Sequence, residues 1–261
     1  MIRSLLLFLF ASTLIGEAHA AIRTEKIAYN HEGVHLEGYV AWDDASQQKR
    51  PGILVVHEWW GLNDYIRKRA TQLAEMGYVA FAVDMFGEGR VTDHPKQASE
   101  WMAQVQSDSG VWMGRAMAGM KLLQEHRLVD QQKLAAIGYC FGGATVQKLA
   151  FAKTPLQCVV SFHGPPMTPP EDWDGSRAPR VLMCHGSADQ FIADDAVLAF
   201  QKAMNKANAD WQFVSYAGAR HAFTNPAAGE YGIENLKYNP TADRRSWNMM
   251  REMFSESFGR K

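Results

Sequence analysis

The sequence lacks an excess of charge of either sign. Its 27 lysine and arginine residues nearly balance 28 aspartate and glutamate residues, the formal net charge is −1, and neither sign forms a long run. Proteins that bind nucleic acids or anionic membranes usually concentrate basic side chains on one face. The composition therefore gives no support to a nucleic-acid or lipid-surface partner.

Long apolar runs are also absent, apart from one near the N-terminus that is shorter than the roughly 20 residues needed to cross a bilayer. A basic Arg3, an apolar run over 5–15 and a small-x-small site at Ala18-His19-Ala20 have the form of a secretory signal peptide. We expect residues 1–20 to be removed after Ala20. The mature protein is then expected to be secreted to the periplasm, without a membrane anchor.

Cysteine is scarce, and the three present are an odd number, which leaves at least one free thiol in a secreted chain. Cys158 and Cys184 each lie in an apolar, strand-like segment, where a free thiol packs well. A disulfide between them is the less favoured alternative. Cys140 lies in a glycine-rich segment and needs a different explanation.

About 240 residues follow the predicted signal peptide, and they contain no repeat, low-complexity tract or domain linker. Strands and helices alternate from about residue 53, which predicts one α/β domain over 21–261, with a mostly parallel sheet covered by helices on both faces. Expected strands are 34–42 (an antiparallel edge strand), 53–56, 78–86, 133–139, 158–162, 180–184 and 211–216. Expected helices are 62–76 (capped by Asn63 and stopped by Gly77), 95–106, 111–126, 142–152, 193–207 and a last one capped by Thr241.

The segment Gly138-Tyr139-Cys140-Phe141-Gly142-Gly143 has the form G-x-nucleophile-x-G, with cysteine as the nucleophile. It follows a predicted strand and opens a predicted helix, which is the context that this motif requires. The positive N-terminal end of the helix favours a thiolate, and the Phe141 amide is well placed as an oxyanion donor. A glycine-rich turn with a merely buried cysteine is the alternative.

Two further residues follow in the chain order of α/β-hydrolases, which is nucleophile, acid, histidine. Asp189 comes just after the strand 180–184, and His221 comes just after the strand 211–216. The carboxyl ends of parallel strands meet at one edge of the sheet, so we expect both side chains to approach Cys140. His221 is then the base and Asp189 the group that orients it.

The sequence resembles the dienelactone hydrolase family from about residue 32 to residue 258. The resemblance rests on four segments: His57-Glu58-Trp59-Trp60-Gly61-Leu62, Gly138 to Gly143, Gly186-Ser187-Ala188-Asp189 and Arg220-His221-Ala222-Phe223. It implies an α/β-hydrolase fold and a Cys–His–Asp triad that cleaves esters or lactones, with no cofactor. It further implies that Glu58 contacts the resting thiol and that the Trp59 amide is the second oxyanion donor.

Two positions depart from the family pattern. Members that cleave dienelactone hold its carboxylate with two arginines, where this chain has Asn225 and, in the loop after the strand 78–86, Glu88. Arg90 lies nearby and is a candidate for an anionic substrate, although a solvent-exposed arginine is the simpler interpretation. Local aromatic residues favour an apolar substrate pocket instead, and the candidates for substrate contact are Trp60, Phe86, Arg90 and Phe223.

Three histidines at strand ends, namely His57, His163 and His185, raise the question of a metal. They lack closely spaced ligand pairs, so we expect no metal site. The expected partner is a small ester or lactone. The alternatives are a thioesterase or peptidase, and a periplasmic binding or thiol-sensing protein on a hydrolase scaffold. The sequence gives no indication of the oligomeric state.

Overall fold

The computed structural model describes residues 21–259, so the predicted signal peptide lies outside the described residues. The strands are β1 (Ile22–His31), β2 (Val34–Asp43), β3 (Arg50–Val56), β4 (Val79–Val83), β5 (Val129–Tyr139), β6 (Cys158–Phe162), β7 (Arg180–Gly186) and β8 (Trp211–Tyr216). The α helices are α1 (Asp64–Glu75), α2 (Pro95–Gln106), α3 (Ser109–Glu125), α4 (Phe141–Phe151), α5 (Asp194–Lys206) and α6 (Pro240–Phe258), and a short 3-10 helix covers Ala228–Tyr231.

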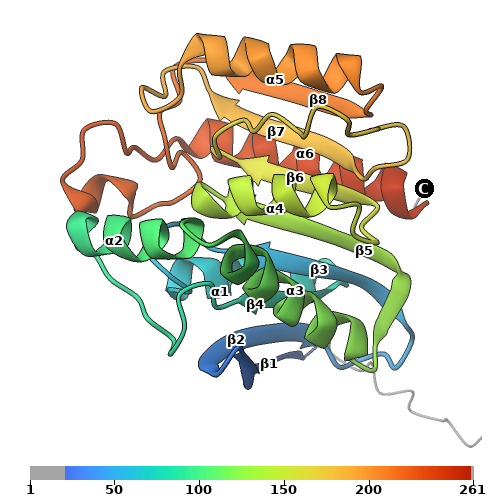
Figure 1. Cartoon of the computed structure of the whole chain (residues 1–261). Coiled ribbons are helices and arrows are strands. Elements are labelled where there is room, and N and C mark those ends of the chain that lie inside the picture. Colours follow the sequence, from blue (N-terminus) through green and yellow to red (C-terminus); the bar gives the residue numbers. More distant parts are fainter. Residues whose placement is uncertain (1–20, 260–261) are drawn as a thin grey trace, which may run out of the picture.

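The strands form one eight-stranded sheet in the order β1-β2-β4-β3-β5-β6-β7-β8 (Figure 1). All neighbouring pairs from β4 to β8 are parallel, whereas β2 pairs in antiparallel orientation with both β1 and β4. This arrangement confirms the predicted α/β-hydrolase fold class. Because the six strands β3 to β8 run the same way, the connections that follow them all leave from one edge of the sheet.

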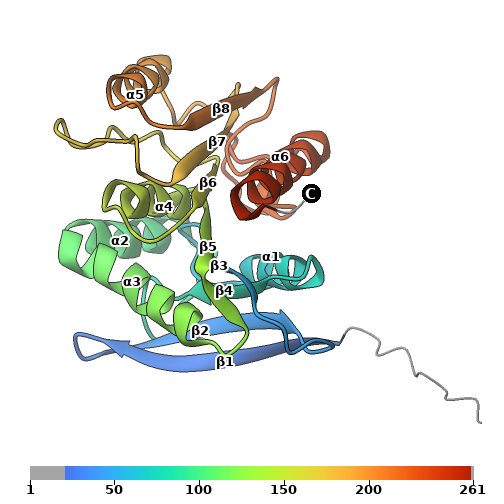
Figure 2. The same ribbon diagram turned by 90° about the vertical axis from the view of Figure 1, so that its right-hand side faces the viewer.

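Helices cover both faces of the sheet (Figure 2). One face packs against α2, α3, α4 and α5, and the other packs against α1 and α6, each through a continuous apolar layer. Strands buried on both faces read as unbroken apolar runs, as β3 and β4 do, since all their residues are buried. Met250, Phe254 and Phe258 form an apolar stripe on α6 that is buried in the second layer.

Two local predictions were wrong. The strand β2 is not an edge strand, because β1 pairs with it along its whole length, from Ile22 opposite Asp43 to His31 opposite Val34. The last helix is capped by Asn239 rather than Thr241. The Asn239 side chain accepts hydrogen bonds from the amides of Thr241 and Ala242. Pro240 occupies the first helical position, where an N–H group would have no partner within the helix and is therefore not needed.

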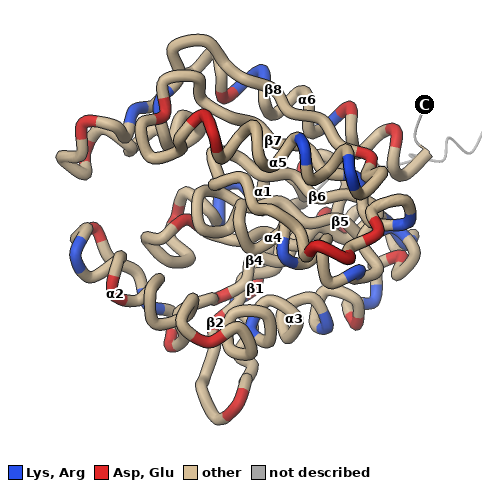
Figure 3. Tube along the Cα trace, turned by 45° about the horizontal axis from the view of Figure 1, so that its top comes forward, with Lys and Arg blue, Asp and Glu red and all other residues tan. Residues whose placement is uncertain are grey.

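Charged residues of both signs are interspersed along the chain trace (Figure 3). All three cysteines are free, and Cys158 and Cys184 are buried. Within residues 21–259, each helix is too short or too polar to cross a membrane.

Candidate active site

Cys140 lies on a sharp turn between β5 and α4. Its backbone has φ 53° and ψ −112°, a conformation that L-residues rarely adopt. The turn forms only because neighbouring positions lack side chains: a Cβ at Gly138 would lie 2.0 Å from the Gly142 carbonyl oxygen, and one at Gly142 would lie 2.2 Å from the Val56 oxygen. The predicted nucleophile turn is therefore present, with a strained backbone that lifts Cys140 above the sheet edge.

Of the two amides predicted to hold an oxyanion, that of Phe141 begins α4 directly after Cys140, and that of Trp59 lies in the loop after β3. Neither the Phe141 nor the Trp59 amide donates a hydrogen bond to another group in residues 21–259. The loop that carries Trp59 is fixed by His57, whose Nε2 accepts from the Met85 amide at 3.1 Å. The Nδ1 hydrogen of His57 is then donated to the Glu58 carbonyl oxygen, so His57 has a structural role.

His221 and Asp189 meet at the same edge of the sheet, as predicted. His221 Nδ1 lies 2.7 Å from Asp189 Oδ2. The other carboxylate oxygen of Asp189 accepts from the Phe191 amide at 2.9 Å and from Asn235 Nδ2 at 3.2 Å. Burial tends to raise the pKa of Asp189, but these hydrogen bonds hold it below its ordinary range. Asp189 is therefore an anion that fixes the imidazole.

Cys140 lines the same cavity as His221 and is close enough to act on the protonation of the imidazole. Burial lowers the pKa of His221, but the charge and hydrogen bond of Cys140 and the contact with Asp189 outweigh burial and raise the pKa to about 10. These contacts therefore favour the protonated form of the imidazole. The predicted residues Cys140, His221 and Asp189 are brought together.

Glu58 is buried close to these groups. Burial raises its pKa to about 7, against the opposing effects of Asn225, His221 and Arg69. Its Oε2 accepts a hydrogen bond of 2.7 Å from Asn225 Nδ2, and Asn225 is itself fully buried. Asn225, which departs from the family pattern, therefore anchors Glu58. The predicted contact between Glu58 and the thiol stays a prediction.

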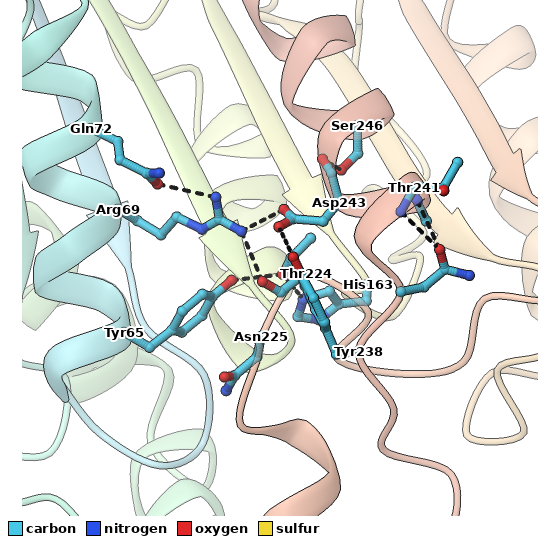
Figure 4. Close-up of polar contacts among 12 residues, drawn as sticks. Tyr65, Arg69, Gln72, His163, Thr224, Asn225, Tyr238, Thr241, Asp243 and Ser246 are labelled. Atoms are coloured by element: carbon cyan, nitrogen blue, oxygen red, sulfur yellow. Dashed lines mark hydrogen bonds and ion pairs between the residues drawn. The ribbon is translucent and has the colours of Figure 1, made fainter.

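A buried polar cluster fixes the loop that carries His221 through contacts with Thr224 (Figure 4). Arg69, which lies on α1, donates to the Thr224 carbonyl oxygen at 2.8 Å and forms a short ion pair with Asp243 on α6. The Thr224 hydroxyl lies 2.7 Å from the Tyr65 hydroxyl and 2.6 Å from His163 Nε2. The cluster thereby joins α1, α6 and the loop after β6 to the histidine loop.

His163 belongs to this cluster and also packs against the catalytic candidate. Its ring centroid lies 5.3 Å from that of His221, in an edge-on arrangement. Burial, the neighbouring His221 and Arg69 lower the pKa of His163 well below its ordinary value. His163 is thus a neutral side chain that packs against the His221 ring. His163 and Asn225 were noted in the sequence for other reasons, whereas Asn235 and Thr224 were not identified from it.

A cavity of about 320 Å³ opens beside the sulfur of Cys140. Its volume is near the lower end of the usual range for small-molecule sites. The lining comes from seven separate parts of the chain: Trp59, Met102, Gln106, Cys140, Phe141, Ala144, Pro165, Phe191, Ile192, His221 and Leu236. This places the sulfur and the imidazole in the wall of a pocket that a small substrate could enter.

The four side chains predicted to contact substrate lie outside this lining. Trp60 is buried and stacked on Tyr231 at a centroid distance of 3.9 Å. Phe86 and Phe223 are buried in the core. Arg90 lies 5.8 Å above the Trp101 ring and pairs with Glu88 at 3.9 Å. Their contacts are within the protein, so we do not expect them to touch a substrate in this cavity.

No group of three or more histidine, cysteine, aspartate or glutamate side chains in residues 21–259 is arranged to hold a metal ion. The three histidines that raised this question have other partners. His57 and His163 hydrogen-bond within the site, and the His185 ring packs at a tilt against Phe213, with a centroid distance of 5.4 Å.

Comparison with known proteins relates this chain to one family. A model of the dienelactone hydrolase family matches residues 36–258. The chain is 27% identical over 238 residues to Protein usf of Aquifex pyrophilus, and the match covers 89% of this chain and 98% of that protein.

Two solved structures are more similar in sequence. One is a dienelactone hydrolase-like promiscuous phosphotriesterase from metagenomic libraries, with a TM-score of 0.86, 36% identity, and coverage of 90% of this chain and 98% of that one. The other is m3DLH, with a TM-score of 0.87, 37% identity, and coverage of 91% and 99%. The similarity therefore extends over the whole sheet and the loops at its edge.

Proposed function

The chain belongs to the dienelactone hydrolase family and is a hydrolase, and from this premise we propose that it cleaves ester or lactone bonds with Cys140 as nucleophile. In this proposal His221 is the general base and acid, and Asp189 orients the imidazole and stabilises its charged form. The amides of Phe141 and Trp59 bind the oxyanion.

The reaction has two halves. The Cys140 thiolate attacks the carbonyl carbon, and the oxyanion is held by the two amides. When the tetrahedral intermediate collapses, the C–O bond breaks, the His221 imidazolium gives its proton to the departing alkoxide, and a thioester remains. His221 then takes a proton from water, which attacks the thioester, so that the acid is released and the thiolate is restored. Each step uses these side chains, the two amides and water.

One observation supports this proposal most directly. The sulfur lies on a strained turn at the wall of a cavity, and the same wall holds an imidazole whose Nδ1 is 2.7 Å from a buried carboxylate. A merely structural cysteine has no need of any of these features. Cys158 and Cys184 differ in each respect, since both are buried within strands.

Substitution and alkylation test the assignment. We expect Cys140→Ala to abolish hydrolysis of p-nitrophenyl esters with the fold retained, and Cys140→Ser to keep weak activity at most, because a hydroxyl is far less acidic than a thiol. One equivalent of iodoacetamide per chain is expected to inactivate the wild type. Cys184→Ala, which changes a buried thiol, is the matched control. Hydrolysis that survives complete alkylation of Cys140 would refute the mechanism.

A panel of p-nitrophenyl esters, lactones, thioesters and peptides separates the bond classes. Preference for thioesters or peptides would redirect the assignment within the hydrolases. No turnover with any short-chain ester or lactone would favour a binding or thiol-sensing protein on the same scaffold.

We also propose export to the periplasm, on the strength of the sequence pattern over residues 1–20. N-terminal sequencing of the protein recovered from a periplasmic fraction is expected to begin at Ala21. Recovery in the cytoplasmic fraction with residues 1–20 attached would contradict this.

A further inference from the structure

The cavity beside Cys140 carries no charge apart from the reacting groups themselves. Among residues 21–259, its lining contains no lysine, arginine, aspartate or glutamate, and Gln106 is its one neutral polar side chain. The remainder is aromatic, aliphatic or proline. A substrate group that enters this cavity therefore exchanges water for an apolar surface.

A carboxylate on that group would be strongly disfavoured. It would lose its hydration without gaining a lysine or arginine, and it would also approach the sulfur of Cys140. His221, the cationic side chain in the wall, is already paired with Asp189. Arg90 pairs with Glu88 over the Trp101 ring, and Asn225 donates to Glu58, so neither is a free donor. The site thus offers an anionic group little compensation.

The mouth of the cavity favours an apolar group instead. Phe191 is 56% exposed although it is a large apolar residue, and its ring lies edge-on to His221 at a centroid distance of 5.1 Å. A bound apolar group would cover this ring and remove its surface from water. Ile192, next to it, is already almost buried at 8%.

We propose that the substrates are neutral esters or lactones whose apolar group occupies this cavity, and that analogues with a carboxylate on that group are rejected. This inference rests on the proposed function. It assigns the substrate class from the apolar cavity wall, at whose rim Gln106 and Phe191 lie.

Two matched substrate pairs test the proposal, one for each side of the ester bond. The acyl pair is p-nitrophenyl butyrate and p-nitrophenyl hemisuccinate, in which a carboxylate replaces the terminal methyl group. The alcohol pair is p-tolyl acetate and 4-acetoxybenzoate. We expect the neutral member of at least one pair to have a kcat/KM on the order of 100-fold higher, from the penalty for an unpaired buried carboxylate. Comparable kcat/KM values within both pairs would overturn the proposal.

A pair of variants at the rim assigns the discrimination to this cavity. Gln106 is exposed at the C-terminal end of α2, where an arginine is compatible with the helix dipole. We expect Gln106→Arg to raise the charged-to-neutral kcat/KM ratio of the discriminating pair by about tenfold, through pairing with the carboxylate. Gln106→Met, of similar length and without charge, is expected to leave the ratio unchanged. An unchanged ratio in Gln106→Arg would place the discrimination elsewhere and overturn the assignment.

Different results would contradict the proposed function and the proposed substrate class. If the proposed function is wrong, neither pair is hydrolysed, or hydrolysis persists in Cys140→Ala. If only the substrate class is wrong, Cys140-dependent hydrolysis proceeds equally well with charged and neutral members.

Discussion

Glu58 is expected to destabilise the fold at neutral and alkaline pH, and its replacement by glutamine tests this. Its pKa is raised from the ordinary value of 4.5 to about 7, mainly by burial. A group that binds protons more tightly in the folded state makes the fold less stable as the pH rises from its unfolded pKa to its folded pKa. The loss is therefore spread between about pH 4.5 and pH 7, and it is complete above pH 7.

The size of this effect follows from the two pKa values. A tenfold change in proton affinity corresponds to about 1.4 kcal/mol, so the difference between 4.5 and about 7 is equivalent to about 3 kcal/mol. Glutamine has the same shape and can still accept the hydrogen bond from Asn225 Nδ2. We expect Glu58→Gln to unfold with a free energy about 3 kcal/mol higher than the wild type at pH 8, and about 1 kcal/mol higher at pH 5.

Urea denaturation of both proteins at pH 5 and pH 8 measures these differences. The matched control is Glu75→Gln, which changes an exposed glutamate on α1 and is expected to alter stability by less than about 0.5 kcal/mol at either pH. A Glu58→Gln difference that is the same at both pH values, or that favours the wild type at pH 8, would refute the argument from burial.

Three further outcomes follow from the structure. Arg69→Met breaks a buried ion pair and leaves Asp243 without its cation, so we expect the free energy of unfolding in urea to fall by about 3–5 kcal/mol. The control Arg67→Ala removes an exposed pair with Asp64 and is expected to cost about 1 kcal/mol at most. Equal losses in the two variants would contradict the assignment. Gly142→Ala places a Cβ 2.2 Å from the Val56 oxygen and is expected to lower both stability and turnover, whereas Gly229→Ala meets no atom within 4 Å and serves as the control in the same thermal and kinetic assays. In Cys140→Ala the His221 pKa should fall below about 10, because the sulfur that raises it is gone and burial opposes the charge; an unshifted NMR titration of the imidazole would argue against the ion pair.

The parts of the molecule that the sequence predicts well are those governed by local rules. The turn at Cys140 needs small residues at fixed spacings, and the strand before it and the helix after it show in the apolar pattern. Asp189 and His221 follow strands, and parallel strands end at one edge, so their convergence follows from chain order. These features require no knowledge of side-chain packing.

The parts that were missed depend on tertiary contacts or on weak local signals. The strand β1 is mostly exposed on both faces, so it shows no alternation of apolar and polar residues, and its pairing with β2 alone defines it. Both Asn239 and Thr241 are capping residue types, and the proline between them indicates which one caps.

The lining of the cavity was not predicted, for a related reason. Aromatic residues close to the motifs in sequence, such as Trp60 and Phe223, face the core, whereas Met102 and Leu236 reach the cavity from distant segments. Sequence proximity does not indicate which face of a loop a side chain takes. Only the packing of α2 and of the loop before α6 against the sheet edge determines that wall.

Phe191 carries two separable contributions on different atoms. Its amide nitrogen holds Asp189, and this bond is independent of the residue type unless proline is introduced. Its ring forms part of the pocket mouth and faces solvent. Evolution or laboratory selection could therefore vary this side chain to admit new substrates while the orientation of the acid stays intact, which makes position 191 a natural starting point for altering the enzyme's repertoire.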